Sequence, residues 1–187
     1  ALGDLNSNWE YLWQNDSLYF YYDGTIGDID AINVPQIYQG IELEANYITI
    51  DGFNIRYYSS SCIYPTKRYA QPGQRGVNIF NNELAYTGSV DGDGLGCQLN
   101  YSDLVYRNNK SHDNGRRQLS VYTYNNIQIR NILIEDNEMW NSPHTGIDIA
   151  TNNTGDQMFN IVIRRNHFHT PYPGEDPGQI SFINHSN

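Results

Sequence analysis

A repeat of 27 to 29 residues is the feature that most constrains how this chain folds. Five equivalent points can be marked along the sequence, at Phe53, Asn82, Asn109, Asn137 and Asn166, and the steps between them are 29, 27, 28 and 29 residues. Repeats of this length are typical of solenoids, in which each repeat is one unit that buries its apolar side against its neighbours. The chain is therefore expected to form a stack of coils.

Each repeat contains three short segments with the alternation of β-strands. The second segments lie at 48–50, 77–79, 104–106, 132–134 and 161–163, and a third short strand begins three residues after each of them. No long segment has the 3.6-residue period of a helix, and β-branched residues are frequent. We predict an all-β fold, a single-stranded right-handed parallel β-helix of about five to six coils. Residues 127–129 also fit the second-strand pattern, which indicates an extra strand or a shifted register in that coil.

The first strand of each coil contributes one polar residue between apolar ones, as Asp148 does between Ile147 and Ile149. Side chains alternate along a strand, so these polar residues are expected to point outward and form a ladder with rungs about 4.8 Å apart. The predicted ladder is Glu42, Tyr64, Gln98, Ser120, Asp148 and Ser181.

Ionisable residues precede the same strands. They are Asp91 and Asp93 in VDGDG, His112, Arg116 and Arg117 in SHDNGRRQ, and His144 in NSPHTG. Loops held by a rigid scaffold are where binding and catalytic residues concentrate, so a site is expected on this face around Asp148. An ordinary solvated face with Asp-Gly turns is the other interpretation. His167 and His169 lie on the third strand and are interpreted as structural.

Four asparagines occupy the turn between the second and third strands, namely Asn82, Asn109, Asn137 and Asn166. Stacked asparagines can hydrogen-bond one another and the backbone, and asparagine tolerates the left-handed conformation of a sharp turn. We expect these residues to be structural.

Residues 1–39 do not repeat. Their aromatic segments, including SLYFYYDG, predict a strand or hairpin that packs on the solenoid formed by residues 40–187. Neither end offers an amphipathic helix to cap the stack, so we expect part of a longer β-helix or self-association through open coil ends.

The composition argues against two classes of partner. The net charge is −10, and lysine occurs only at Lys67 and Lys110. Nucleic acids and anionic membranes both select for basic surfaces, so neither is an expected partner.

The repeat, the segment YITIDGF at 47–53 and the asparagine turn resemble the pectate-lyase-like right-handed β-helix superfamily over roughly residues 40–187. The segments RRQLSV at 116–121 and PHTGIDI at 143–149 resemble coils of secreted and phage-tailspike β-helix proteins. This resemblance implies a secreted or cell-surface protein that acts on or binds polysaccharide. The superfamily holds hydrolases, lyases, epimerases and noncatalytic fibres, so it leaves the activity open.

The sequence favours an enzyme, most of all a glycoside hydrolase with paired carboxylates. Asp148 and Asp93 would share the acid and base roles, at roughly 10 Å along the axis before loop geometry is counted, and His144 would tune them. The predicted substrate contacts are Arg116, Arg117, Gln98, Ser120, Tyr64 and His112, with Tyr64 as a stacking platform. No cofactor is required.

Two alternatives stay open. One is a noncatalytic segment of an extracellular fibre, adhesin or tailspike that binds glycan or neighbouring chains. The other is a polysaccharide lyase, in which a calcium ion held by Asp91 and Asp93 would neutralise a uronate carboxylate.

Overall fold

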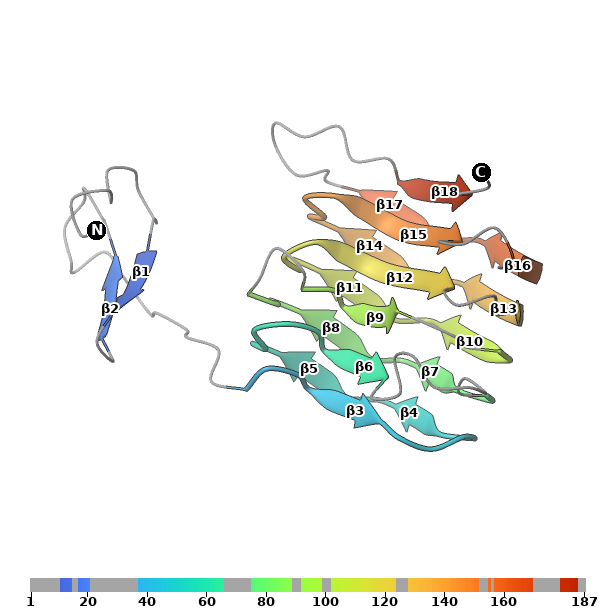
Figure 1. Cartoon of the computed structure of the whole chain (residues 1–187), viewed down its shortest axis with the longest axis horizontal. Helices are drawn as coiled ribbons and strands as arrows, with labels where there is room; N and C mark the ends of the chain where they lie inside the picture. Colours follow the sequence, from blue (N-terminus) through green and yellow to red (C-terminus); the bar gives the residue numbers. More distant parts are fainter. Residues whose placement is uncertain are drawn as a thin grey trace. The chain divides into compact units, whose positions relative to one another are not determined.

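The computed structural model shows a parallel β-solenoid (Figure 1). It describes residues 11–14, 17–20, 37–65, 75–88, 92–98, 102–123, 128–151, 155, 157–169 and 179–184. The chain divides into two compact units, Ala1–Val34 and Pro35–Asn187. Among the described residues there is no helix, and thus none that could span a membrane.

The first unit contains an antiparallel hairpin of β1 (Tyr11–Gln14) and β2 (Ser17–Phe20). This agrees with the predicted N-terminal hairpin. Its packing on the solenoid stays a prediction.

Three parallel sheets make up the solenoid, and the chain visits them in turn. The first sheet contains β3 (Ile41–Leu43), β6 (Ile63–Pro65), β9 (Leu95–Gln98), β12 (Arg117–Thr123), β15 (Thr145–Thr151) and β18 (Ile180–Asn184). The second contains β4 (Thr49–Asp51), β7 (Asn78–Phe80), β10 (Leu104–Arg107), β13 (Gln128–Glu135) and β16 (Gln157–Arg164). The third contains β5 (Asn54–Arg56), β8 (Glu83–Ala85), β11 (Lys110–His112), β14 (Glu138–Trp140) and β17 (His167–His169).

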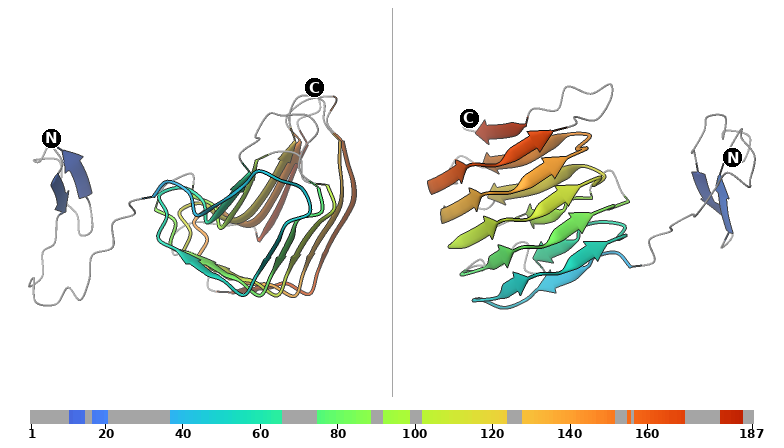
Figure 2. Two further views of the ribbon diagram at one scale, coloured as in Figure 1. Left: turned by 90° about the horizontal axis from the view of Figure 1, so that it is seen from below. Right: turned by 180° about the vertical axis from the view of Figure 1, so that it is seen from behind.

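The core runs along the inside of this stack. Seen along the stack, successive coils nearly overlay (Figure 2, left). Inward residues of the three sheets therefore align in columns, such as Leu95, Leu119 and Ile147 in the first sheet, and all three are fully buried. Each coil alone has too few apolar residues to bury, so the columns are what stabilise the stack.

Each coil turns at corners that use positive φ angles. At the first corner these residues are Tyr47, Gly76 and Asp103, which precede β4, β7 and β10, and Asn131 and Asn160, which lie within β13 and β16. Between the second and third strands they are Gly52, Asn81, Asn108, Asp136 and Arg165. After the third strand they are Tyr57, Tyr86, Asp113 and Asn141. Asparagine, aspartate and glycine dominate because they tolerate the left-handed region best.

One sequence expectation is corrected at the second corner. The stacked asparagines were expected to adopt the left-handed conformation themselves, but the residue before each of them does so. This frees the stacked amides to point inward. The ambiguity at 127–129 is resolved for its described part, since β13 continues upstream of Asn131 and bends there without a shift in register.

The asparagine ladder is confirmed and is fully hydrogen-bonded at its centre. Asn109 Nδ2 donates to Ile79 O at 2.9 Å and to Asn137 Oδ1 at 3.2 Å, while Asn109 Oδ1 accepts from the backbone N–H of Asn82 at 2.9 Å. The side chain is 1% exposed. The ladder therefore satisfies backbone groups that the turn removes from the sheets.

Replacing Asn109 by alanine is expected to lower the free energy of unfolding by roughly 2 to 3 kcal/mol, because it removes the acceptor of the buried Asn82 N–H and the donor to Ile79 O. Urea unfolding measures this change. Asn54→Ala, an exposed asparagine on the outer face of β5, is the matched control and should cost less than about 0.5 kcal/mol. Equal effects of the two substitutions would mean that the ladder does not stabilise the fold.

Candidate functional site

Five polar side chains gather on the outer face of the first sheet, and we name them the buried polar cluster: Asp93, Arg117, Ser120, Tyr122 and Asp148. The apolar residues Leu119, Val121, Ile147 and Ile149 belong to the core. Strand alternation therefore places Ser120 and Asp148 on the opposite side of the sheet, as predicted, and Tyr122 lies on the same side. Asp93 lies two residues before β9.

The burial of this cluster was not predicted. Asp148 is 1% exposed, Arg117 3% and Asp93 2%, and every residue of β12 and β15 is buried. The expected solvent-facing stripe is thus wrong at its centre, although Glu42 at one end is exposed. Alternation predicts the direction of a side chain, but it carries no information about whether that side of the sheet is solvated.

Asp148 is held by two partners on β12. Its Oδ2 lies 2.6 Å from Arg117 Nε in an ion pair and accepts a hydrogen bond from the Tyr122 hydroxyl. Arg117 also lies over the Tyr122 ring, 5.2 Å from its centroid. Burial, reinforced by the hydrogen bond to Asp148, raises the pKa of Tyr122, so this hydroxyl remains a donor.

Asp93 has a different environment. Its Oδ2 accepts a hydrogen bond from Ser120 Oγ at 2.7 Å. Burial raises the pKa of Asp93 to about 6, against the opposing effects of the Ser120 hydrogen bond and the nearby Arg117 and Arg116 charges. Asp93 is therefore a proton donor at mildly acid pH, whereas Asp148 faces a guanidinium.

Several buried polar atoms of this region have no hydrogen-bond partner among the described residues. They are Asp93 Oδ1, Asp148 Oδ1, Arg117 Nη1 and Thr145 Oγ1. Thr145 is next to Arg117 in the β12–β15 register. Buried polar atoms almost always have partners, so a concentration of them points to water or a ligand rich in hydrogen-bonding groups.

The register corrects the predicted ladder at one rung. Tyr122 pairs with Gln98 and Ser120 pairs with Gly96, so Gly96 takes the place expected for Gln98. Gln98 lies two residues further along β9, in a position of the same parity. A Cβ on Gly96 would lie 2.6 Å from Ser61 Oγ, so a side chain does not fit there.

The other predicted ligand-binding residues lie in varied surroundings. Tyr64 is buried, which removes its ring as an open stacking platform. His144 is exposed in the turn before β15 and donates its backbone N–H to Arg116 O at 3.1 Å, and Arg116 is half-buried. Asp91 lies outside the described residues.

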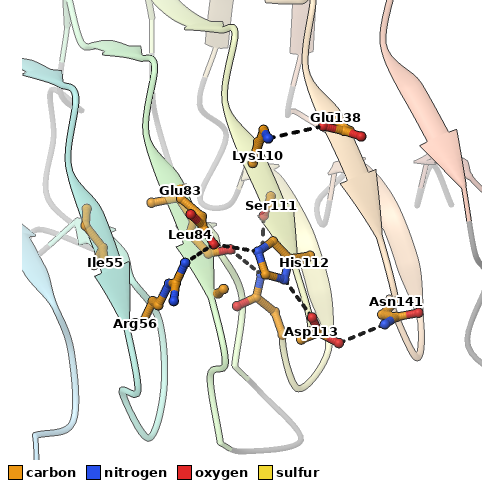
Figure 3. Close-up of polar contacts among 12 residues, drawn as sticks. Ile55, Arg56, Glu83, Leu84, Lys110, Ser111, His112, Asp113, Glu138 and Asn141 are labelled. Carbon is orange, nitrogen blue, oxygen red and sulfur yellow. Dashed lines mark hydrogen bonds and ion pairs between the residues drawn. The ribbon is translucent and has the colours of Figure 1, made fainter.

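His112 belongs to a separate network on the third sheet (Figure 3). Its Nδ1 lies 2.6 Å from Asp113 Oδ2 and its Nε2 lies 2.9 Å from Glu83 Oε1. Glu83 also binds Arg56. Burial raises the pKa of Glu83, but the hydrogen bonds from His112 and Arg56 outweigh it and hold the pKa below its usual value. Both ring nitrogens of His112 are thus engaged away from Asp148.

Aromatic rings stack along the outer face of this third sheet. Tyr57 stacks on Tyr86 at 5.3 Å, His112 on Trp140 at 4.0 Å, and Trp140 on His169 at 5.2 Å. Stacking covers ring faces with other rings of the same protein. These stacked pairs stabilise the coil stack, and Tyr57 and Tyr86 remain 42% and 39% exposed.

Sequence reasoning missed Tyr122, although its place two residues after Ser120 on one strand would have put it on the same face. No protein-family model, curated protein or solved structure matched the chain when each was searched.

Proposed function

We propose that this β-solenoid is a carbohydrate-active protein that hydrolyses a glycosidic bond of an extracellular polysaccharide at the buried polar cluster. The observation that carries the proposal is the group of buried, unpartnered polar atoms of Asp93, Arg117, Thr145 and Asp148 on one face. A sugar offers many hydroxyls that both donate and accept hydrogen bonds. Such a ligand would satisfy carboxylate, guanidinium and hydroxyl groups together.

The two carboxyl groups suit different roles. Asp93, with its pKa raised to about 6, protonates the leaving oxygen as general acid. Asp148 uses Oδ1 to accept a proton from water, while Arg117 and Tyr122 hold Oδ2. Asp93 accepts a hydrogen bond from Ser120 on β12, and Ser120 lies beside Asp148 in the register of the adjacent strand β15. Two strand spacings give a separation of roughly 10 Å between backbone positions, which favours inversion over retention.

The charge of the cluster favours a neutral glycan. Arg117 is paired with Asp148, so no cation of the cluster is left to neutralise a uronate carboxylate. A lyase needs such a cation or a metal ion, and a chain of net charge −10 repels an anionic polymer. Calcium binding by Asp91 and Asp93 is therefore a weaker proposal than hydrolysis of neutral polysaccharide.

Incubation of the full chain with neutral and uronate-containing polysaccharides tests the proposal. Hydrolysis is expected to release reducing ends from a neutral polymer without ultraviolet-absorbing unsaturated products, and the first product should have inverted anomeric configuration. Asp148→Asn should lose this activity while still binding the polymer. Unsaturated products would instead identify a lyase, and an unchanged rate in Asp148→Asn would place the chemistry elsewhere.

A noncatalytic fibre segment is the second candidate function. Two observations favour it: both carboxyl groups are at most 2% exposed, and Ile180 and Phe182 on β18 are 39% and 67% exposed, as a contact surface for another chain would be. This function predicts no product from any polysaccharide, together with concentration-dependent self-association in sedimentation experiments.

A further inference from the structure

Two histidines and one glutamate lie together on the outer face of the third sheet, and we name them the histidine cluster: Glu138, His167 and His169. One potential ligand atom from each residue lies within 4.8 Å of those from the other two. Sequence reasoning left both histidines as structural. The cluster is on a different sheet from the buried polar cluster, so the inference below does not depend on the proposed hydrolysis.

The strand geometry explains how these residues meet. His167 and His169 are two residues apart on β17 and therefore point to the same side, while the intervening Phe168 packs against the core. The register of β14 and β17 places Glu138 beside His167. Glu138 Oε1 lies 3.0 Å from His169 Nε2, and the two imidazole centroids are 4.8 Å apart.

The surroundings orient two of the three residues. Trp140 stacks on the His169 ring at 5.2 Å and 19° between planes. Lys110 Nζ lies 3.8 Å from Glu138 Oε2 (Figure 3). The other carboxylate oxygen, Oε1, faces His169. His167 is exposed, which gives an ion access from solvent.

We propose that the histidine cluster binds one divalent transition-metal ion of the zinc type, which ties β17 to β14. Two imidazoles and one carboxylate form a donor set that Zn²⁺ uses, with a fourth position left for water or a further ligand. Tetrahedral zinc with bonds of about 2.0 to 2.2 Å needs ligand atoms roughly 3.3 to 3.6 Å apart. Small side-chain rotations bring atoms now within 4.8 Å to that spacing.

The charged groups around the histidine cluster predict how its metal affinity changes on substitution and with pH. Lys110 is the cation paired with Glu138, so Lys110→Met should strengthen metal binding, because it removes a like charge from the site. Protons compete with the metal for imidazole nitrogen, so binding should weaken as the pH falls. A cluster with only a structural role would show neither response.

Titration of the full chain with Co²⁺, followed by visible absorption and by competition with Zn²⁺, tests the proposal after any histidine tag is removed. One equivalent should bind. His167→Ala should weaken binding by more than about 100-fold, since loss of even an outer-shell partner of a metal ligand costs roughly 10- to 100-fold. His167 is exposed, so this variant should keep the fold, which circular dichroism verifies.

His144→Ala is the matched control, because it removes another exposed histidine outside the cluster and should leave metal affinity unchanged. Glu138→Gln should weaken binding while keeping the side-chain shape. The proposal is overturned if the wild-type chain binds neither Co²⁺ nor Zn²⁺, or if His167→Ala and His169→Ala bind as tightly as the wild type.

Discussion

Asp148→Asn is expected to lower the free energy of unfolding by about 3 to 5 kcal/mol. The substitution leaves Arg117 charged and 3% exposed, with Nη1 already lacking a described hydrogen-bond partner. Breaking a buried ion pair by neutralising one member costs about this much, because the remaining charge stays desolvated. Urea unfolding at neutral pH, with circular dichroism and tyrosine or tryptophan fluorescence as independent probes, measures the change.

A double-mutant cycle separates the ion pair from other effects. Arg117→Met should also destabilise, and the double variant Arg117→Met/Asp148→Asn should be more stable than the sum of the single effects predicts, because no unpaired charge remains. Lys110→Met removes one member of an exposed pair, 3.8 Å from Glu138, and serves as the control with an expected change below about 1 kcal/mol. A similarly small change for Asp148→Asn would show that the cluster is solvated.

The fold was predictable because the repeat is enforced by burial. Coils that bury one another need the same strand positions in each repeat, so the 27- to 29-residue period and the stacked asparagines were visible in the sequence alone. The exact register was not. Leu95 and Cys97 are two residues apart, so both occupy inward positions of an alternating strand. The apolar pattern therefore allows either residue as the partner of Leu119. The strand pairing in the structure shows that the partner is Leu95.

The outward direction of two residues of the buried polar cluster was predictable, but their environment was not. Outward pointing of Asp148 and Ser120 follows from alternation, whereas their burial and the raised pKa of Asp93 depend on what surrounds that face. His112 shows the same limit. Its sequence neighbours Arg116 and Arg117 suggested a shared loop, yet His112 belongs to β11 and is directed to Glu83 on the adjacent strand.

Under the proposed hydrolysis, Asp93→Asn is expected to lower the catalytic rate and to raise stability. Asparagine cannot supply the proton of a general acid, so hydrolysis of the polysaccharide should fall by roughly 10²- to 10⁴-fold. An aryl glycoside with an activated leaving group needs little protonation, and its hydrolysis should fall much less. A uniform loss on both substrates would contradict the acid role of Asp93.

The pH dependence follows from the raised pKa. In the folded state Asp93 keeps its proton up to about pH 6, whereas in the unfolded chain the carboxyl group releases it near its ordinary pKa of 3.8. The folded state therefore binds more protons between these values, and the contribution of Asp93 to stability falls as the pH rises through this window. The rise of the Asp93 pKa from 3.8 to about 6 corresponds to about 3 kcal/mol of folding free energy. If Asp93 is the general acid as proposed, the hydrolysis rate of the wild type should likewise decline above about pH 6, because Asp93 loses its proton.

Asp93→Asn should remove the pH dependence of both the stability and the hydrolysis rate. The variant should be more stable than the wild type above pH 6, because it no longer has to bury a carboxylate, and its residual activity should lack the alkaline decline. Paired unfolding curves at pH 4 and pH 7, with rates measured over the same range, check this. An increase in stability together with a decrease in the hydrolysis rate is expected if Asp93 is retained for catalysis at the expense of folding stability. Loss of stability at pH 7 would instead mean that the carboxylate of Asp93 is part of the structural network with Ser120.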